Sequence, residues 1–337
     1  MRFGVLQFFS WPGRRGELRD VYQGALQRVE KMDSTGYDCV WLAEHHFNDF
    51  SVCPSVFMMG VQCAAITETV RIGTAVSLVG FAHPLRIAEE AALLDVLSGG
   101  RLNFGAGRGA DPTEHRVFGV APEDSHDQFR EQLGIVLEAW RNERLTYRSD
   151  RWDFDDIELM PKPLQAPAPP VWAAASSPPA ISWAASQGHD ILLDPHSTHA
   201  DIGTKVTRYR EQLAAAGHST EHRTTPIGRL VCIAPTDEEA NVVARKGAEW
   251  TVRSYASAEH GNVGADLRPE GSTDDGFYAA DPVGRYVDNV MIWGSPARVV
   301  DELQRLEEEI DLEYLLASPM SQQTFHLLTD EVLPKLL

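Results

Sequence analysis

The residues best suited to bind a charged ligand follow a short apolar run at residues 102–104. Three glycines come next at alternate positions, Gly105, Gly107 and Gly109, and Arg108 lies among them. Glycine lets the backbone approach a flat ligand closely and turn sharply, because it has no Cβ. A guanidinium can hold a phosphate through two parallel hydrogen bonds. The pattern therefore favours a contact with a phosphate-bearing ligand; a tight turn that leaves Arg108 in solvent is the alternative.

Two adjacent histidines, His45 and His46, close the second predicted strand at its carboxyl end, directly after Glu44. Neighbouring residues of a strand point to opposite faces, so one ring should face the mouth of the fold and the other should pack outward. Histidine titrates near neutral pH and can hold or pass a proton. The pair is a candidate for acid–base chemistry, with Glu44 as an orienting partner. A loop pair that caps a helix or binds water is the alternative.

Two serines, Ser176 and Ser177, precede Pro178 and Pro179 at a predicted helix start. The amides and the dipole of a helix N-terminus suit this position to an anion. The prolines lack an N–H group, so the serine hydroxyls would have to replace the missing donors. We expect a second phosphate contact here, at the same rim as Arg108; simple helix capping is the alternative.

We expect no metal site. His218 and His222 have a spacing of four residues that would suit a metal on a helix, but they follow a helix-ending glycine and lack a third ligand nearby. The cysteines show neither metal nor disulfide spacing and are typical of scattered thiols in a reducing cytoplasm; they are Cys39, Cys53, Cys63 and Cys232. A cytoplasmic location is therefore expected.

The composition limits the classes of partner. The chain has 337 residues, 43% of them hydrophobic, with a net charge of −19 and a pI near 5.0. Such a polyanion repels nucleic acid and anionic membranes, so neither is expected as a partner. The sequence starts directly with a strand pattern and contains neither a signal-peptide pattern nor a long uncharged apolar run. These properties indicate a soluble protein.

Eight short apolar runs, each followed by a helical pattern, alternate along the chain. The predicted strands are residues 2–8, 39–43, 71–78, 102–104, 171–174, 191–193, 227–234 and 312–317. Strands that alternate with helices form a parallel sheet, and eight such units fit a closed (β/α)8 TIM barrel, an α/β fold, as a single domain over residues 1–337. An open doubly wound sheet is the alternative.

Three longer segments are predicted as insertions: residues 109–124, 146–169 and 257–285. The last of them is rich in Gly, Asp and Ser, and we expect it to be a mobile loop. The first and the last follow the carboxyl end of a strand, where the active sites of such barrels lie. Residues 257–285 are therefore predicted to form a lid over the site.

Four parts of the sequence resemble the bacterial luciferase-like flavin monooxygenase family. They are residues 36–47, residues 73–76 with 82–86, residues 100–105 with 108–109, and residues 115–119. Each part alone is unspecific, whereas their order over most of the chain is specific. The resemblance implies a (β/α)8 barrel that binds reduced FMN (FMNH2), supplied by a separate NAD(P)H-dependent flavin reductase. It also implies that O2 adds at the flavin C4a position, and that the resulting peroxide or hydroperoxide oxygenates a small, largely apolar organic substrate.

The resemblance also implies roles for individual residues. His45 corresponds to the family's catalytic histidine beside the flavin ring, and Arg108 to an arginine that contacts the FMN phosphate. Ala75 and Val76 correspond to a non-prolyl cis peptide under the isoalloxazine. The residues expected to contact the cofactor are Glu44, Ala75, Val76, Gly107, Arg108, Ala175, Ser176 and Ser177. A homodimer is expected, because related barrels commonly dimerise.

The sequence departs from the family pattern at three positions. Gly107 stands where light-emitting members carry a reactive cysteine, so we do not expect light emission. His126 stands where many members have a phosphate-binding arginine, and Asp111 replaces an aromatic residue. Two other functions stay open: a deazaflavin-dependent dehydrogenase or reductase on the same barrel, and a flavin-binding protein without turnover.

Overall fold

The centre of the computed structural model, which describes residues 1–221, 223–255, 272–276 and 279–337, is a closed barrel of eight parallel strands. Its order is β1, β2, β3, β5, β8, β9, β10 and β12. A bridge between Leu193 and Ile227 closes it, because Leu193 N donates to Pro226 O and Gly228 N to Leu193 O, both at 3.0 Å. The strands span Arg2–Gln7, Cys39–Leu42, Arg71–Thr74, Leu102–Gly107, Val171–Ala174, Asp190–Leu192, Pro226–Ile233 and Tyr314–Pro319. The expected barrel is thus confirmed.

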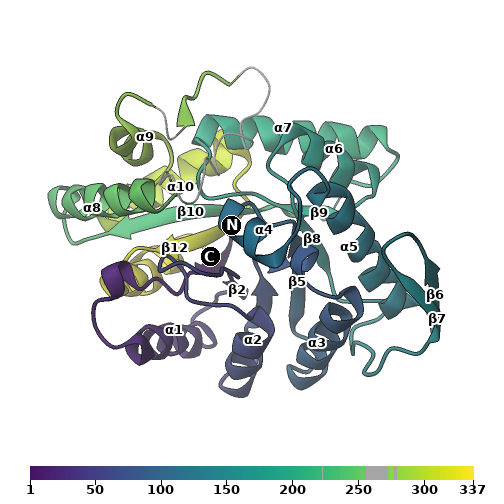
Figure 1. Ribbon diagram of the computed structural model, residues 1–337. Coiled ribbons are helices and arrows are strands. Elements are labelled where there is room, and N and C mark those ends of the chain that lie inside the picture. The colour runs from purple at the N-terminus through teal and green to yellow at the C-terminus, as the bar shows by residue number, and fades with distance from the viewer. Residues whose placement is uncertain (222, 256–271, 277–278) are drawn as a thin grey trace.

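Helices surround these strands, as Figure 1 shows. They are α1 (Leu18–Met32), α2 (Val56–Ala65), α3 (Pro84–Leu97), α5 (Ser125–Arg141), α6 (Pro178–Ser186), α7 (His199–Ala215), α8 (Asp237–Tyr255), α10 (Pro296–Ile310) and α11 (Gln322–Leu327). Each turns an apolar stripe toward the sheet. In α1, for example, Ala25, Val29 and Met32 are buried at helical spacing. No helix in the described ranges has both the length and the apolar character to cross a membrane.

Aromatic side chains fill the inside of the barrel. The indole Nε1 of Trp41 donates to the hydroxyl of Tyr314 at 3.1 Å, and Trp172 meets Trp41 edge to face with ring centroids 5.3 Å apart. A Cβ at Gly73 would lie 2.3 Å from the ring of Trp41, so only glycine fits beside this indole. Because the interior is packed, a ligand can bind only at an end of the barrel.

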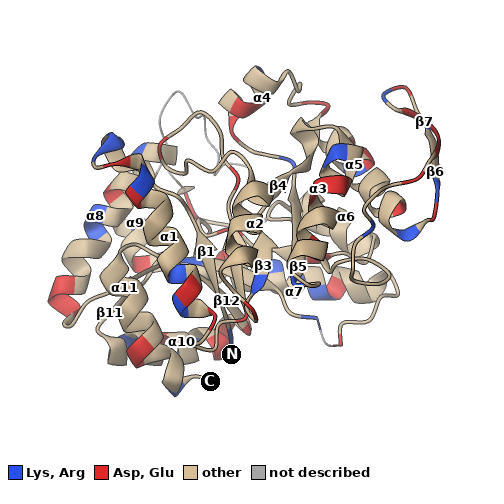
Figure 2. Ribbon diagram, turned by 90° about the horizontal axis from the view of Figure 1, so that it is seen from below, with Lys and Arg blue, Asp and Glu red and all other residues tan. Residues whose placement is uncertain are grey.

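Two of the predicted insertions contain regular structure. Residues 109–124 include α4 (Pro112–Phe118), which Figure 2 places at the end of the molecule opposite the N terminus. The first half of residues 146–169 lies in an antiparallel hairpin of β6 (Leu145–Arg148) and β7 (Asp153–Ile157). The hairpin packs outside the barrel, where Arg151 pairs with Glu131 of α5. Only the first of these two segments therefore contributes to the carboxyl end of the strands.

The prediction of a single loop over residues 257–285 was wrong at its end. Most of that range, and with it the predicted lid, lies outside the described residues, but α9 spans Pro282–Asn289. A further strand that the sequence analysis did not predict, β11 (Ile292–Gly294), pairs with β10 outside the barrel. The predicted strand 71–78 is also split, because β4 (Ser77–Leu78) is separate and pairs with β5.

Candidate active site

A cavity of about 570 Å³ lies at the carboxyl ends of the strands. It brings together side chains that are up to 249 positions apart in the chain, from Leu6 to Tyr255. The predicted residues that line it are Glu44, His45, Ala75, Val76, Gly107, Arg108, Ser176 and Ser177. Ala175, also predicted to contact the cofactor, is buried in the core and does not line the cavity.

One wall of this cavity is built from small residues. The peptide bond between Ala75 and Val76 is cis, and a Cβ at Gly107 would lie 2.3 Å from Cγ2 of Val76. Behind this wall, Thr74 Oγ1 donates to Gly105 O at 2.6 Å and accepts from Gly105 N at 2.9 Å. Glycine at position 107, the end of β5, therefore allows β5 to approach Val76 closely and leaves room for a flat ligand.

His45 faces the cavity from the end of β2. Its ring lies between Phe8 and Phe50, with ring centroids 6.0 and 4.4 Å away. Its Nδ1 is buried, makes no hydrogen bond, and lies 3.6 Å from the carboxylate of Glu114 on α4. The aromatic contacts fix the ring, and the carboxylate of Glu114 is the acidic group beside it. The sequence analysis missed Glu114, which stands about 70 positions away without a motif.

His46 points away from the cavity. Its Nε2 lies 3.2 Å from Oε1 of Glu44, and its ring packs edge to face on Phe118 at 4.8 Å. Glu44 accepts a second hydrogen bond from the amide of Leu78 at 3.2 Å. Glu44 therefore orients His46 rather than His45, although its side chain also lines the cavity.

The opposite side of the cavity is suited to an anion. Arg108 Nη1 donates to Ser125 Oγ at 2.9 Å, at the start of α5. Ser177 is the N-cap residue of α6, but its side chain makes no capping hydrogen bond. The alternative interpretation of Ser177 as a simple helix cap is therefore not supported. Arg130 lines the same cavity, one helical turn after His126. The sequence analysis missed Arg130, although the spacing of four residues places both side chains on one face of a helix.

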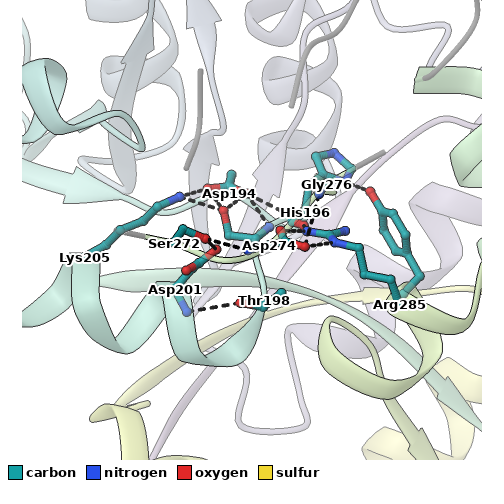
Figure 3. A network of polar contacts seen from close by, with 11 residues as sticks. Asp194, His196, Thr198, Asp201, Lys205, Ser272, Asp274, Gly276 and Arg285 are labelled. Atoms are coloured by element: carbon teal, nitrogen blue, oxygen red, sulfur yellow. Dashed lines mark hydrogen bonds and ion pairs between the residues drawn. The ribbon is translucent and has the colours of Figure 1, made fainter. Parts of the chain in front are cut away.

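Asp194 lies in a polar network with His196 and Lys205 (Figure 3). Burial alone would raise the pKa of Asp194, but Lys205, His196 and a hydrogen bond from Ser176 outweigh it and hold this pKa well below its usual range. The ammonium of Lys205 lies 3.0 Å from Asp194 Oδ2. Asp194 is thus a permanent anion that fixes the position of Ser176 from behind.

His196 is a second histidine on the cavity wall. Its Nδ1 lies 2.9 Å from the hydroxyl of Tyr286, and Arg285 donates to its carbonyl at 3.0 Å. Burial, together with repulsion from Arg285, lowers the pKa of His196 to about 4, although Asp194 opposes the shift. His196 is therefore neutral at pH 7.

The family described as luciferase-like monooxygenases matches residues 1–311. One relative is the oxygenase component of the flavin-dependent trigonelline monooxygenase of Acinetobacter baylyi. It is 26% identical over 248 residues, which are 73% of this chain and 69% of the relative.

Solved structures with the same fold include two different classes of enzyme. The oxygenating constituent of 3,6-diketocamphane monooxygenase from Pseudomonas putida, in complex with FMN, has a TM-score of 0.80 and 20% identity over 100% of this chain and 99% of that chain. An F420-dependent secondary alcohol dehydrogenase has a TM-score of 0.76 and 18% identity over 99% and 97% of the two chains. At these identities the likeness concerns the fold.

Proposed function

Because this chain belongs to the luciferase-like monooxygenase family, we propose that it is the oxygenase component of a two-component flavin system. In this proposal it binds reduced FMN and O2 and oxygenates a small, largely apolar organic substrate. A separate NAD(P)H-dependent flavin reductase supplies the reduced flavin. The observation that carries the proposal is the cavity in which a proton-handling histidine faces an anion site across a wall of small residues.

The anion side of the cavity fits the phosphate of FMN. Arg108 and Arg130 supply two cations, and Ser177 supplies a hydroxyl that is not used in capping. Asp194 and Lys205 hold Ser176 in place from behind. The second arginine compensates for His126, which stands where many family members carry an arginine.

The middle of the cavity fits a flat ring. Ala75, Val76 and Gly107 form the wall of small residues, beside which there is space for the ring. Leu6 and Phe8 line the cavity near His45. Reduced FMN, when bound, supplies the electrons with which O2 is activated for insertion of one oxygen atom into a substrate. The tightly packed wall of small residues would also help to keep water away from the reacting centre.

His45 is the residue that would hold or move a proton in this reaction. Its Nδ1 faces Glu114, so Nε2 is the ring nitrogen available to the cavity. Phe8 and Phe50 would keep the plane of the ring fixed, with the carboxylate of Glu114 3.6 Å from Nδ1. Positioned acid–base groups of this kind typically contribute about 10²–10⁴-fold to a reaction rate.

We further propose a homodimer in the cytoplasm. Exposed apolar side chains lie on α2, α3 and α4, three elements on one side of the barrel, and an exposed surface of this kind is typical of protein contacts. They are Met58, Leu93, Val96, Leu97, Val117 and Phe118. The four cysteines are all buried thiols, in keeping with a reducing compartment.

A deazaflavin-dependent dehydrogenase is the second candidate, and the F420-dependent enzyme with the same fold favours it. Anaerobic titration of the protein with reduced FMN and with reduced F420 separates the two. We expect reduced FMN to bind at least tenfold more tightly, and Arg108→Ala to weaken it by about 1.5–3 kcal/mol, or roughly 10- to 100-fold.

Arg116→Ala is the matched control, since Arg116 is exposed on α4 and does not line the cavity. This variant should bind reduced FMN within twofold of the parent. Tighter binding of F420 would favour the dehydrogenase. An Arg108→Ala affinity equal to that of the control would show that the phosphate lies elsewhere.

A further inference from the structure

The cavity of about 570 Å³ described above is called the flavin cavity from here on, after the proposed function. A second cavity, of about 460 Å³, adjoins it; we call it the side chamber. The two share four lining residues, Leu6, Phe8, His196 and Tyr255. A molecule in the side chamber would therefore reach the face of the flavin cavity that carries His45. The side chamber extends from this junction toward the space between α1, α8 and α11.

The walls of the side chamber change in character along its length. Phe50, Leu230 and Trp250 are apolar residues that line it together with the four junction residues. Gln7 lies on the other face of β1, because neighbouring strand residues alternate in direction, and it lines the chamber beyond Leu6 and Phe8. An apolar region near the flavin cavity thus gives way to a polar region.

Arg28 is the charged residue of this polar region. It lies on the same face of α1 as Val21 and Gly24, which also line the side chamber. Its Nε donates to Gln7 Oε1 at 3.1 Å, and Gln7 is held in turn because its Nε2 donates to the carbonyl of Phe8. The guanidinium is therefore oriented by a buried amide.

The charge of Arg28 is not balanced within the described part of the chain. None of the carboxylates there forms an ion pair with it, and burial lowers its pKa to about 10, so it remains a cation at pH 7. The other charged residues of the side chamber, Arg15, Glu17 and Asp20, are exposed at its rim. A partly buried cation without a counter-charge is unusual in a protein with a net charge of −19.

We propose that the side chamber binds the organic substrate and that Arg28 recognises a carboxylate on it. The substrate class is then an acid with an apolar body, which points its reacting carbon toward the flavin cavity. A guanidinium fits a planar carboxylate through two parallel hydrogen bonds, and Nη1 and Nη2 of Arg28 have no partner among the described residues. The inference rests on the proposed function, since it assigns a substrate class to that site.

The test uses calorimetric titration of the full chain, without flavin, with three acids and their amides: benzoate, cyclohexanecarboxylate and hexanoate. We expect at least one acid to bind tenfold or more tightly than its amide. In Arg28→Met this preference should disappear, with a 10- to 100-fold loss for the acid. Arg28→Lys, which keeps the charge and loses the bidentate geometry, should retain part of it.

Arg15→Met is the matched control, because Arg15 is a cation at the rim of the same chamber. It should keep the preference for the acid. Equal binding of acid and amide in all three pairs, an unchanged preference in Arg28→Met, or its loss in Arg15→Met would each overturn the proposal. Phenyl phosphate binding more tightly than benzoate would overturn the choice of a carboxylate. Reduced-FMN affinity, measured separately, should be unchanged in Arg28→Met, so failure of the flavin proposal is recognised independently.

Discussion

Two walls of the flavin cavity each carry a histidine, and the two residues have opposite surroundings. His45, at the end of β2, is about a quarter exposed (23% of its side chain) and lies 3.6 Å from the carboxylate of Glu114. His196, after β9, is 9% exposed and bonded to the hydroxyl of Tyr286. Burial and Arg285 lower the pKa of His196 to about 4.

The comparison shows that residue type alone does not assign a role. A histidine that faces a carboxylate and a cavity can exchange a proton with a ligand. A histidine that is buried next to an arginine stays neutral and serves to position its neighbours. This difference supports the proposal that His45 handles the proton and that His196 has a supporting role.

The largest expected effect concerns His45. Replacing it with alanine should leave reduced-FMN binding intact and lower the yield of oxygenated product at least about 10²-fold, because a positioned acid–base group is lost. The electrons should appear as free hydrogen peroxide instead. Product formation by mass spectrometry and a peroxide assay, with a flavin reductase and a substrate that the parent turns over, would measure both.

His46→Ala is the control for that experiment, since His46 packs on Phe118 outside the cavity. It should change stability more than product yield. If His46→Ala abolished product formation and His45→Ala did not, the proposed roles of the two histidines at the end of β2 would be wrong.

The smaller effect concerns His196 and is a dependence of stability on pH. Its pKa is about 4 in the folded state and about 6.5 when unfolded, so protons favour the unfolded chain between these values. Stability from this group is complete above pH 6.5 and falls as the pH falls toward 4. Between pH 6.5 and 5.5 the loss should be about 1 kcal/mol.

Urea unfolding at the two pH values would measure this loss. His196→Asn should make the pH dependence shallower by about that amount. Tyr286→Phe removes the hydrogen-bond partner but keeps the buried histidine, so it should lower stability at both pH values and retain the slope. An unchanged slope in His196→Asn would contradict the assignment of a buried neutral histidine.

The sequence predicts the barrel well because its eight strands are apolar runs that alternate with helical patterns. β11 has three residues and no recognisable period, and α9 follows a stretch rich in Gly, Asp and Ser, so neither was predicted. The split of residues 71–78 was not predicted either: β3 pairs with both β2 and β5, whereas β4 pairs with β5 alone, and the cis peptide between Ala75 and Val76 separates them.

The site was predictable where its residues follow strand ends. His45 and Arg108 do so, and the carboxyl ends of parallel strands meet at one rim. Glu114, Asp194 and Arg28 were not predictable, because they reach His45 or the two cavities from helices or loops without a sequence motif. Only tertiary structure shows which carboxylate faces His45 and which guanidinium lacks a counter-charge.

The central claim is that the protein uses reduced FMN to activate O2, and stopped-flow spectroscopy tests it most directly. The protein with bound reduced FMN is mixed with oxygenated buffer while flavin absorbance and peroxide release are recorded. We predict at least two phases, with a transient spectrum that matches neither reduced nor oxidised FMN and a delayed release of hydrogen peroxide. Oxidation in a single phase, at the rate of free reduced FMN and with immediate release of one peroxide per flavin, would contradict the account.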